Sequence, residues 1–215
     1  MSRPIAIIVA AGLGMLGSAC TGVYYDALEQ VGVEKRHILA DRVEEGREDQ
    51  QEAQEQFQTT FDAFQALTGF QGGDLEDAYR DLADEYDECE ARAEAVRDRI
   101  DSIESVAGDL FEEWESEIGL ISDARMRSRS QSNLRDTRAS YGRLIGAMET
   151  AAARMDPVLG AFRDRVLYLK HNLNSAAIAS LEGDVVEIRG DVGELIADMN
   201  AAIAEADEFL GKLES

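Results

Sequence analysis

The chain has 215 residues and a formal net charge of -23 at pH 7, and it is long enough for one domain of ordinary size. So negative a charge argues against nucleic acid as a partner, because phosphate contacts need a cationic surface, and it disfavours broad adsorption to anionic lipid. Two prolines and an abundance of Ala, Glu, Asp, Arg and Leu favour long helices.

Residues 1–19 have the pattern of a secretory signal peptide. Arg3 gives a positive start, residues 5–16 form an apolar run too short to span a membrane in the mature chain, and residues 17–19 are small. Cys20 follows, and the stretch Leu16–Cys20 resembles a bacterial lipobox with its Leu one position further from the cysteine than usual. We predict lipid attachment at Cys20 and a tether over 20–23. Cleavage without acylation, leaving a free thiol, is one alternative, and an uncleaved membrane anchor is another, less favoured because the apolar run is short and rich in Gly.

Residues 24–215 are expected to form one helical domain with four helices, over 24–69, 74–121, 124–155 and 157–213. The second helix has the clearest pattern, because its apolar or small residues recur at alternating spacings of four and three. These residues are Leu75, Tyr79, Leu82, Tyr86, Cys89, Ala93, Val96, Ile100, Ile103, Ala107, Leu110 and Trp114. A period of 3.5 is typical of coiled coils. Cys89 is therefore expected to be a buried thiol.

Turn and capping residues set the predicted boundaries. Gly72-Gly73-Asp74 ends the first helix and caps the second, and Asp156-Pro157 is interpreted as the start of the fourth. The fourth pattern slips between residues 173 and 181, which predicts a stutter that locally unwinds the coil.

The first helix has an uneven apolar seam. Gly46, Gln50 and Ala53 make its middle thin, whereas Phe57, Phe61 and Phe64 make its end thick. A thin seam leaves room for a ligand between helices.

These patterns predict an all-α, elongated antiparallel helical bundle or coiled coil. The third helix is shorter than the second, so one end is expected to contain only two or three helices. The second helix is acidic and residues 125–154 are rich in arginine, so the two are expected to pair. The seams are also compatible with a homo-oligomer.

Few residues offer chemistry. Glu34-x-x-His37 is half of a di-iron carboxylate–histidine pattern, and His171 lacks a matching carboxylate. No zinc cluster, nucleophile elbow or phosphate-binding loop occurs in the sequence. We therefore predict a protein that is not an enzyme and has no cofactor or metal site.

Three polar clusters remain. Lys35, Arg36 and His37 form the first, and Lys170, His171, Asn172 and Asn174 form the second. We interpret both as partner-binding or register-setting residues. Arg125, Arg127 and Arg129 lie at the expected turn between the second and third helices, where they pair with the neighbouring acidic helix or meet a lipid phosphate or acidic partner.

Several stretches together resemble one family. They are Tyr24-Tyr25, Lys35–Leu39, Asp41–Glu44, Gly72–Glu76, Arg99-Ile100, Glu104–Ala107, Leu110–Trp114, Asp156–Leu159 and, as the most specific part, Leu169–Asn174. This pattern is similar to that of the bacterial envelope proteins catalogued as domain of unknown function 2959, often predicted lipoproteins. The resemblance implies an exported helical protein and no assigned activity. By the sorting rule of Gram-negative lipoproteins, Thr21 after the cysteine implies the outer membrane, facing the periplasm.

The favoured prediction is a structural or adaptor lipoprotein that contacts the bilayer through acylated Cys20 and engages an unidentified envelope protein. A helical module that binds a small apolar or lipid ligand is the alternative. A metal-binding protein or enzyme is the least favoured.

Overall fold

The computed structural model describes residues 35–70, 72 and 74–213, which form five helices and no strand. In chain order these are α2 (Lys35–Thr68), α3 (Leu75–Leu120), α4 (Ala124–His171), α5 (Ser175–Ser180) and α6 (Asp184–Leu213). The prediction of an all-α bundle is confirmed. The predicted signal peptide, Cys20, the tether and the first turns predicted for the first helix lie outside the described residues.

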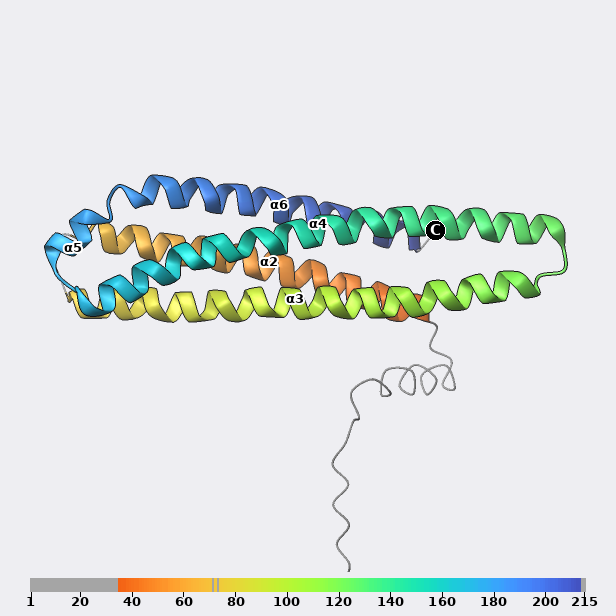
Figure 1. The fold of residues 1–215 in the computed structure, drawn as a ribbon, viewed down its shortest axis with the longest axis horizontal. Coiled ribbons are helices and arrows are strands. Elements are labelled where there is room, and N and C mark those ends of the chain that lie inside the picture. The colour runs from red at the N-terminus through yellow and green to blue at the C-terminus, as the bar shows by residue number, and fades with distance from the viewer. Residues whose placement is uncertain (1–34, 71, 73, 214–215) are drawn as a thin grey trace, which may run out of the picture.

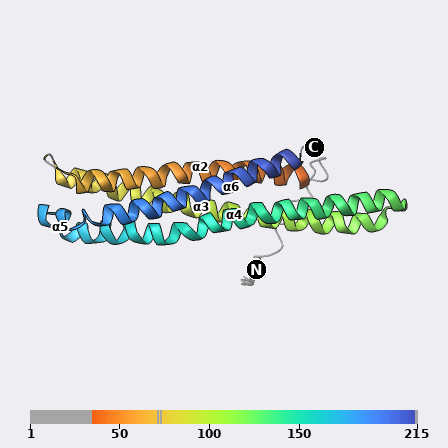
Figure 2. The same cartoon turned by 90° about the horizontal axis from the view of Figure 1, so that it is seen from above.

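The four long helices lie side by side and form a bundle that is elongated along the helix axes (Figure 1). α2 packs against α3 and α6, and α4 packs against the same two helices. Neighbouring helices are antiparallel (Figure 2). At 1.5 Å per residue, the 46 residues of α3 make a rod of about 69 Å.

The predicted seams form the core. Phe57 and Phe64 of α2 are fully buried, and the predicted seam residues of α3 from Leu82 to Ala107 are buried as well. Where α2 begins and α6 ends, Tyr141 lies edge-on to Phe111 and Phe209, with ring centroids 5.4 and 6.3 Å apart. This aromatic group closes one end of the four-helix part.

The prediction that a helix ends at residue 155 and another starts at Pro157 is wrong, because α4 runs through Pro157. A proline inside a helix removes one hydrogen bond and crowds the preceding turn, at a cost of about 3 kcal/mol. The apolar seam nevertheless continues without a break on both sides, through Met148, Ala152, Met155, Leu159, Phe162, Val166 and Leu169, all buried. Burial of this continuous stripe against α3 and α6 outweighs the local cost.

The prediction of one helix over 157–213 is also wrong. The chain reverses between α4 and α6 through the short α5, at the place where the sequence pattern slips. Asn172 caps the end of α4, and the Asn174 side chain accepts hydrogen bonds from the N–H groups of Ala176 and Ala177, both at 3.1 Å. The predicted stutter is therefore a turn that brings α6 back along the bundle.

As expected, one end contains fewer helices, but for a different reason. α4 has 48 residues and matches α3 in length, whereas α2 and α6 have 34 and 30. The α3–α4 hairpin therefore extends beyond the start of α2 and the end of α6 (Figures 1 and 2). We call this two-helix extension the arm, and residues 118–129 at its end the tip.

Candidate functional site

The two predicted partner-binding clusters lie at opposite ends of the four-helix part. Lys35, Arg36 and His37 form the first turn of α2, beside the base of the arm, where Lys35 pairs with Glu113 of α3 at 3.1 Å. Lys170 and His171 end α4 at the α5 end. The structure therefore does not combine these clusters into one site, and His37 and His171 do not share a metal centre.

A groove follows the step where the bundle narrows from four helices to two. Its volume is about 1230 Å³, and we call it the step groove. Apolar side chains from three helices line it together with cationic ones, among them Trp114, Phe209, Leu213, Lys35, Arg36 and Lys212. Three carboxylates, those of Glu113, Glu117 and Asp136, line it as well. The Trp114 indole N–H donates to Ser130 Oγ at 2.9 Å, which joins α3 to α4 at this point. The groove therefore suits an amphipathic group better than a small polar one.

The tip has a defined local structure. Asp123 is the N-cap of α4, and its carboxylate accepts hydrogen bonds from the N–H groups of Arg125 and Met126, both at 2.9 Å. The Arg127 guanidinium donates to the carbonyl of Ile121. These contacts order the turn, and most of the tip is exposed, with Ile118 as its buried residue.

The expected pairing of the tip arginines with α3 is wrong. Within the described residues, Arg125, Arg127 and Arg129 form no ion pair with a carboxylate, although Arg129 lines the step groove together with Glu113 and Glu117 of α3. Further along α4, Arg138 does pair with Glu115 of α3 at 2.9 Å.

Other α4 arginines turn to α6 instead. Arg143 contacts Glu205 and Glu208 at 3.3 and 2.7 Å, and Arg154 contacts Glu194 at 2.7 Å. The expected pairing of this arginine-rich stretch with α3 is therefore only partly present, because the sequence did not show that α4 has two acidic neighbours.

The α5 end carries exposed residues of mixed character. Lys170 and His171 are exposed, and so are three large apolar side chains at this end, Leu167, Tyr168 and Val186. An ion pair between Arg165 and Asp184 at 3.0 Å holds α6 against α4 there. Asn172 and Asn174 have the capping role described above, which the sequence prediction did not include.

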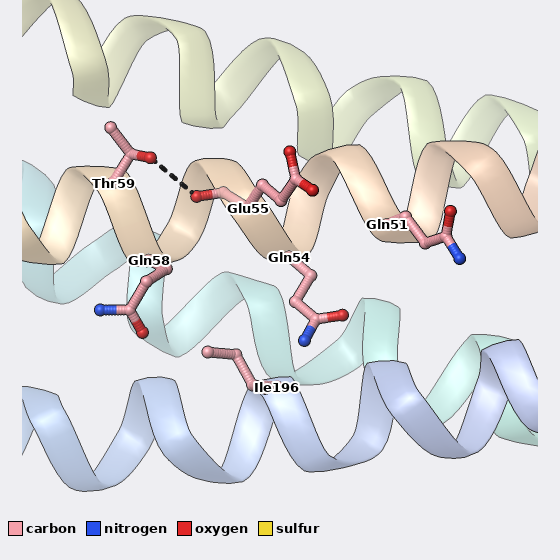
Figure 3. Close-up of a pocket in the computed structure, with 6 residues that line it drawn as sticks. All are labelled: Gln51, Gln54, Glu55, Gln58, Thr59 and Ile196. Carbon is pink, nitrogen blue, oxygen red and sulfur yellow. Dashed lines mark hydrogen bonds between the residues drawn. The ribbon is translucent and has the colours of Figure 1, made fainter.

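A second groove runs between α2 and α6 and has a volume of about 860 Å³. Figure 3 shows its lining, which consists of Gln51, Gln54, Glu55, Gln58, Thr59 and Ile196. The Thr59 hydroxyl donates to the Glu55 carbonyl at 2.9 Å within the helix. The groove is open, and three of its six lining residues are glutamines. Its one carboxylate, that of Glu55, has no basic side chain among the other lining residues, and the Thr59 hydroxyl is bonded to the backbone.

The thin seam of α2 is packed. A Cβ on Gly46 would lie 2.9 Å from Ile103 Cδ1 and 3.3 Å from Met148 Cε, so larger residues of α3 and α4 occupy the space beside this glycine. Gln50, one turn further along, is 1 % exposed, and neither polar atom of its amide has a hydrogen-bond partner. The room predicted here for a ligand is filled by side chains.

Cys89 is fully buried, as expected. Burial raises the pKa of its thiol to about 12, and a hydrogen bond with Thr60 offsets this only in part. The thiol is therefore protonated at neutral pH and is a poor nucleophile or metal ligand.

Neither a membrane-spanning helix nor a metal-binding cluster occurs among the described residues. No described helix has both the length and the apolar composition that crossing a bilayer requires. No group of three or more His, Cys, Asp or Glu side chains in this part of the chain is arranged to hold a metal ion.

A family model described as "Protein of unknown function (DUF2959)" matches residues 24–213. The chain belongs to this family. The match includes every described helix and confirms the resemblance found in the sequence. Comparison with curated proteins and with solved structures gave no match.

Proposed function

We propose that the protein is a non-enzymatic envelope lipoprotein, held at the periplasmic face of the outer membrane by acylated Cys20, whose bundle acts as a structural or adaptor element. The observation that carries this proposal is that the start of α2 and the exposed α5 end lie at opposite ends of the four-helix part. The first described turn of α2 lies at the base of the arm, and the α5 end lies at the other end of the four-helix part (Figure 1).

This arrangement separates attachment from recognition. A chain anchored ahead of α2 would hold the base of the arm near the bilayer and present the α5 end away from it. Exposed apolar side chains beside charged ones are typical of protein interaction surfaces. We therefore place the contact with an envelope protein at Lys170 and His171 and the exposed residues beside them, Leu167, Tyr168 and Val186.

The anchor and the partner contact need separate tests. Cys20→Ala is expected to move the protein from the membrane fraction to the soluble fraction, and unchanged membrane association would contradict acylation. The partner is tested by crosslinking in intact cells and identification of the proteins captured with the tagged chain.

A matched pair of double variants locates the contact. Lys170→Ala/His171→Ala changes the α5 end, and Arg36→Ala/His37→Ala changes the other. Asn172 and Asn174 are left intact because they cap helices. We expect one envelope protein to be captured by the parent and lost only with the first variant. Equal capture by both variants would refute the assignment, and capture of this chain alone would indicate a homo-oligomeric structural element.

The step groove supports a second candidate, a module that binds a small apolar or lipid ligand. Its lining combines apolar side chains with more cationic groups than carboxylates, which suits an acyl chain with an anionic head. Trp114 lines the groove and is the single tryptophan of the chain. Titration with a fatty acid should change its emission if this function holds, and an unchanged spectrum at saturating ligand would exclude it.

A further inference from the structure

The tip has a charge opposite to that of the whole chain. Residues 118–135 contain four arginines, at 125, 127, 129 and 135, and a single acid, Asp123, in a chain of net charge -23. The Asp123 carboxylate caps the N-terminus of α4, where two backbone N–H groups and the helix dipole partly neutralise it. The end of the arm is therefore a local cationic surface.

Two of these cations are free to bind an anion. Arg125 and Arg129 are exposed and form no ion pair within the described residues, in contrast to Arg138, Arg143 and Arg154 further along α4. Guanidinium groups bind phosphate through paired hydrogen bonds as well as charge. Glu117, the nearest exposed carboxylate on α3, directly precedes the tip and lines the step groove together with Arg129.

Large apolar side chains accompany the arginines. Leu120 is 81 % exposed and Met126 is 68 % exposed, and they lie on either side of the turn. Apolar side chains flanked by arginine at the end of a helical hairpin match the headgroup layer of a bilayer, where the apolar groups leave water and the cations stay among phosphates.

The shape of the arm keeps the acidic part of the protein away from such a surface. From Glu113, which pairs with Lys35, to Leu120 the helix rises about 10 Å. The Debye length at physiological salt is about 8 Å, so most of the acidic four-helix part lies beyond one screening length from a surface that the tip touches. Adsorption by the tip is thus compatible with the strong negative charge of the whole chain.

The chain ahead of α2 has the length to permit this orientation. The segment from residue 20 to residue 34 spans at most roughly 50 Å when extended, several times the rise of the arm beyond Lys35. A chain held at Cys20 can therefore reach the surface on which the tip rests.

We propose that the tip of the α3–α4 hairpin docks on the anionic phospholipid headgroups of a bilayer, with Arg125 and Arg129 on the phosphates and Leu120 and Met126 in the interfacial layer. The contact stands on the tip itself and needs no acylation. It goes beyond the proposed anchor by fixing how the rod is oriented.

The test uses the full chain with Cys20→Ser, so that failure here is distinct from failure of the anchor. An environment-sensitive fluorophore is attached through Ser128→Cys, an exposed position between two tip arginines, while Cys89 remains buried and unlabelled. The label reports contact at the tip whatever the rest of the chain binds. The vesicles are phosphatidylcholine alone or phosphatidylcholine with phosphatidylglycerol.

We expect the emission to shift to shorter wavelength, and brominated lipid to quench it, only with the anionic vesicles. Each basic residue near such a surface contributes about 1 kcal/mol, so Arg125→Gln/Arg129→Gln should weaken the response roughly 30-fold, and added salt should weaken the parent response. The matched control, Arg80→Gln/Arg163→Gln, removes two exposed arginines far from the tip and should leave the response unchanged. Circular dichroism verifies that each variant is folded.

Leu120→Ser/Met126→Ser should abolish quenching by brominated lipid while leaving a salt-sensitive contact. Emission of the label that does not change with anionic vesicles, or that changes equally with neutral vesicles, would overturn the proposal. Crosslinking from residue 128 in cells to an acidic protein instead of lipid would overturn it in favour of a protein partner.

Discussion

Gln50 offers a quantitative test of how this core is built. Its side chain is 1 % exposed, and its amide oxygen and nitrogen both lack a hydrogen-bond partner. An unsatisfied buried polar group costs about 1–3 kcal/mol. Gln50→Met keeps the unbranched shape and removes the polar atoms. We therefore expect the free energy of unfolding to rise by about 1–3 kcal/mol, or Tm by roughly 2–4 °C per kcal/mol for a chain of this size.

Thr60 is the matched control on the same helix. It is also fully buried, but its hydroxyl contacts the carbonyls of Gln56 and Glu85 at 2.9 and 3.0 Å. Thr60→Val removes these bonds and leaves the Glu85 carbonyl without this donor, so it should lower the free energy of unfolding by about 1 kcal/mol.

Chemical denaturation followed by circular dichroism, in the chain with Cys20→Ser, measures both changes. Destabilisation by Gln50→Met as large as that by Thr60→Val would contradict the unsatisfied state of the Gln50 amide. That result would mean that buried water satisfies the Gln50 amide in solution.

The other predictions concern backbone packing, capping and the thiol. Gly46→Ala should lower the free energy of unfolding by about 1–3 kcal/mol, since the new methyl would meet Ile103 at 2.9 Å; unchanged denaturation would show that Ile103 moves aside. Pro157→Ala should raise stability by up to about 3 kcal/mol, and a lower denaturation midpoint would mean that the proline stabilises α4. Asn174→Ala should cost about 1 kcal/mol and speed amide exchange in α5, and unaltered exchange would argue against the cap. With Cys20→Ser, Cys89 should resist thiol reagents until unfolding. Because burial raises the pKa of the folded thiol from an ordinary 9.0 to about 12, the unfolded thiol loses its proton first, so its contribution to stability should fall between these pH values. The slope should become shallower with Cys89→Ala, and part of it should remain because burial also raises the pKa of Tyr86 and Tyr141; an unchanged slope would contradict the role of the thiol.

The sequence predicted the helices whose ends carry strong local signals. The predicted range 74–121 agrees with α3 to within one residue at each end, because Asp74 is a cap and the apolar seam is unbroken. The prediction of a helix boundary at Pro157 was wrong, because Asp-Pro is a local signal for a helix start whereas the apolar seam continues on both sides of it. The alternating spacing of four and three from Met148 to Leu169 could have decided in favour of one helix.

The candidate sites were predictable only in part. Lys35 and Arg36 line the step groove, although nothing local to them shows that α6 ends beside them. The tip arginines were identified from their place at the expected turn, but their lack of ion pairs depends on how far the hairpin extends beyond α2 and α6, which is a property of the tertiary fold. The break between α4 and α6 is visible in the sequence, because the regular apolar spacing is interrupted near Asn172, which caps the end of α4, and Asn174, which caps the start of α5.

The arm has a consequence for how this protein can change over evolution. Since only α3 and α4 form it, a paired insertion of one heptad in each would lengthen it by about 10 Å and preserve the inward face. The four-helix part would not be altered, because α2 and α6 stop before that region. Relatives can thus vary the distance between tip and core independently of core stability.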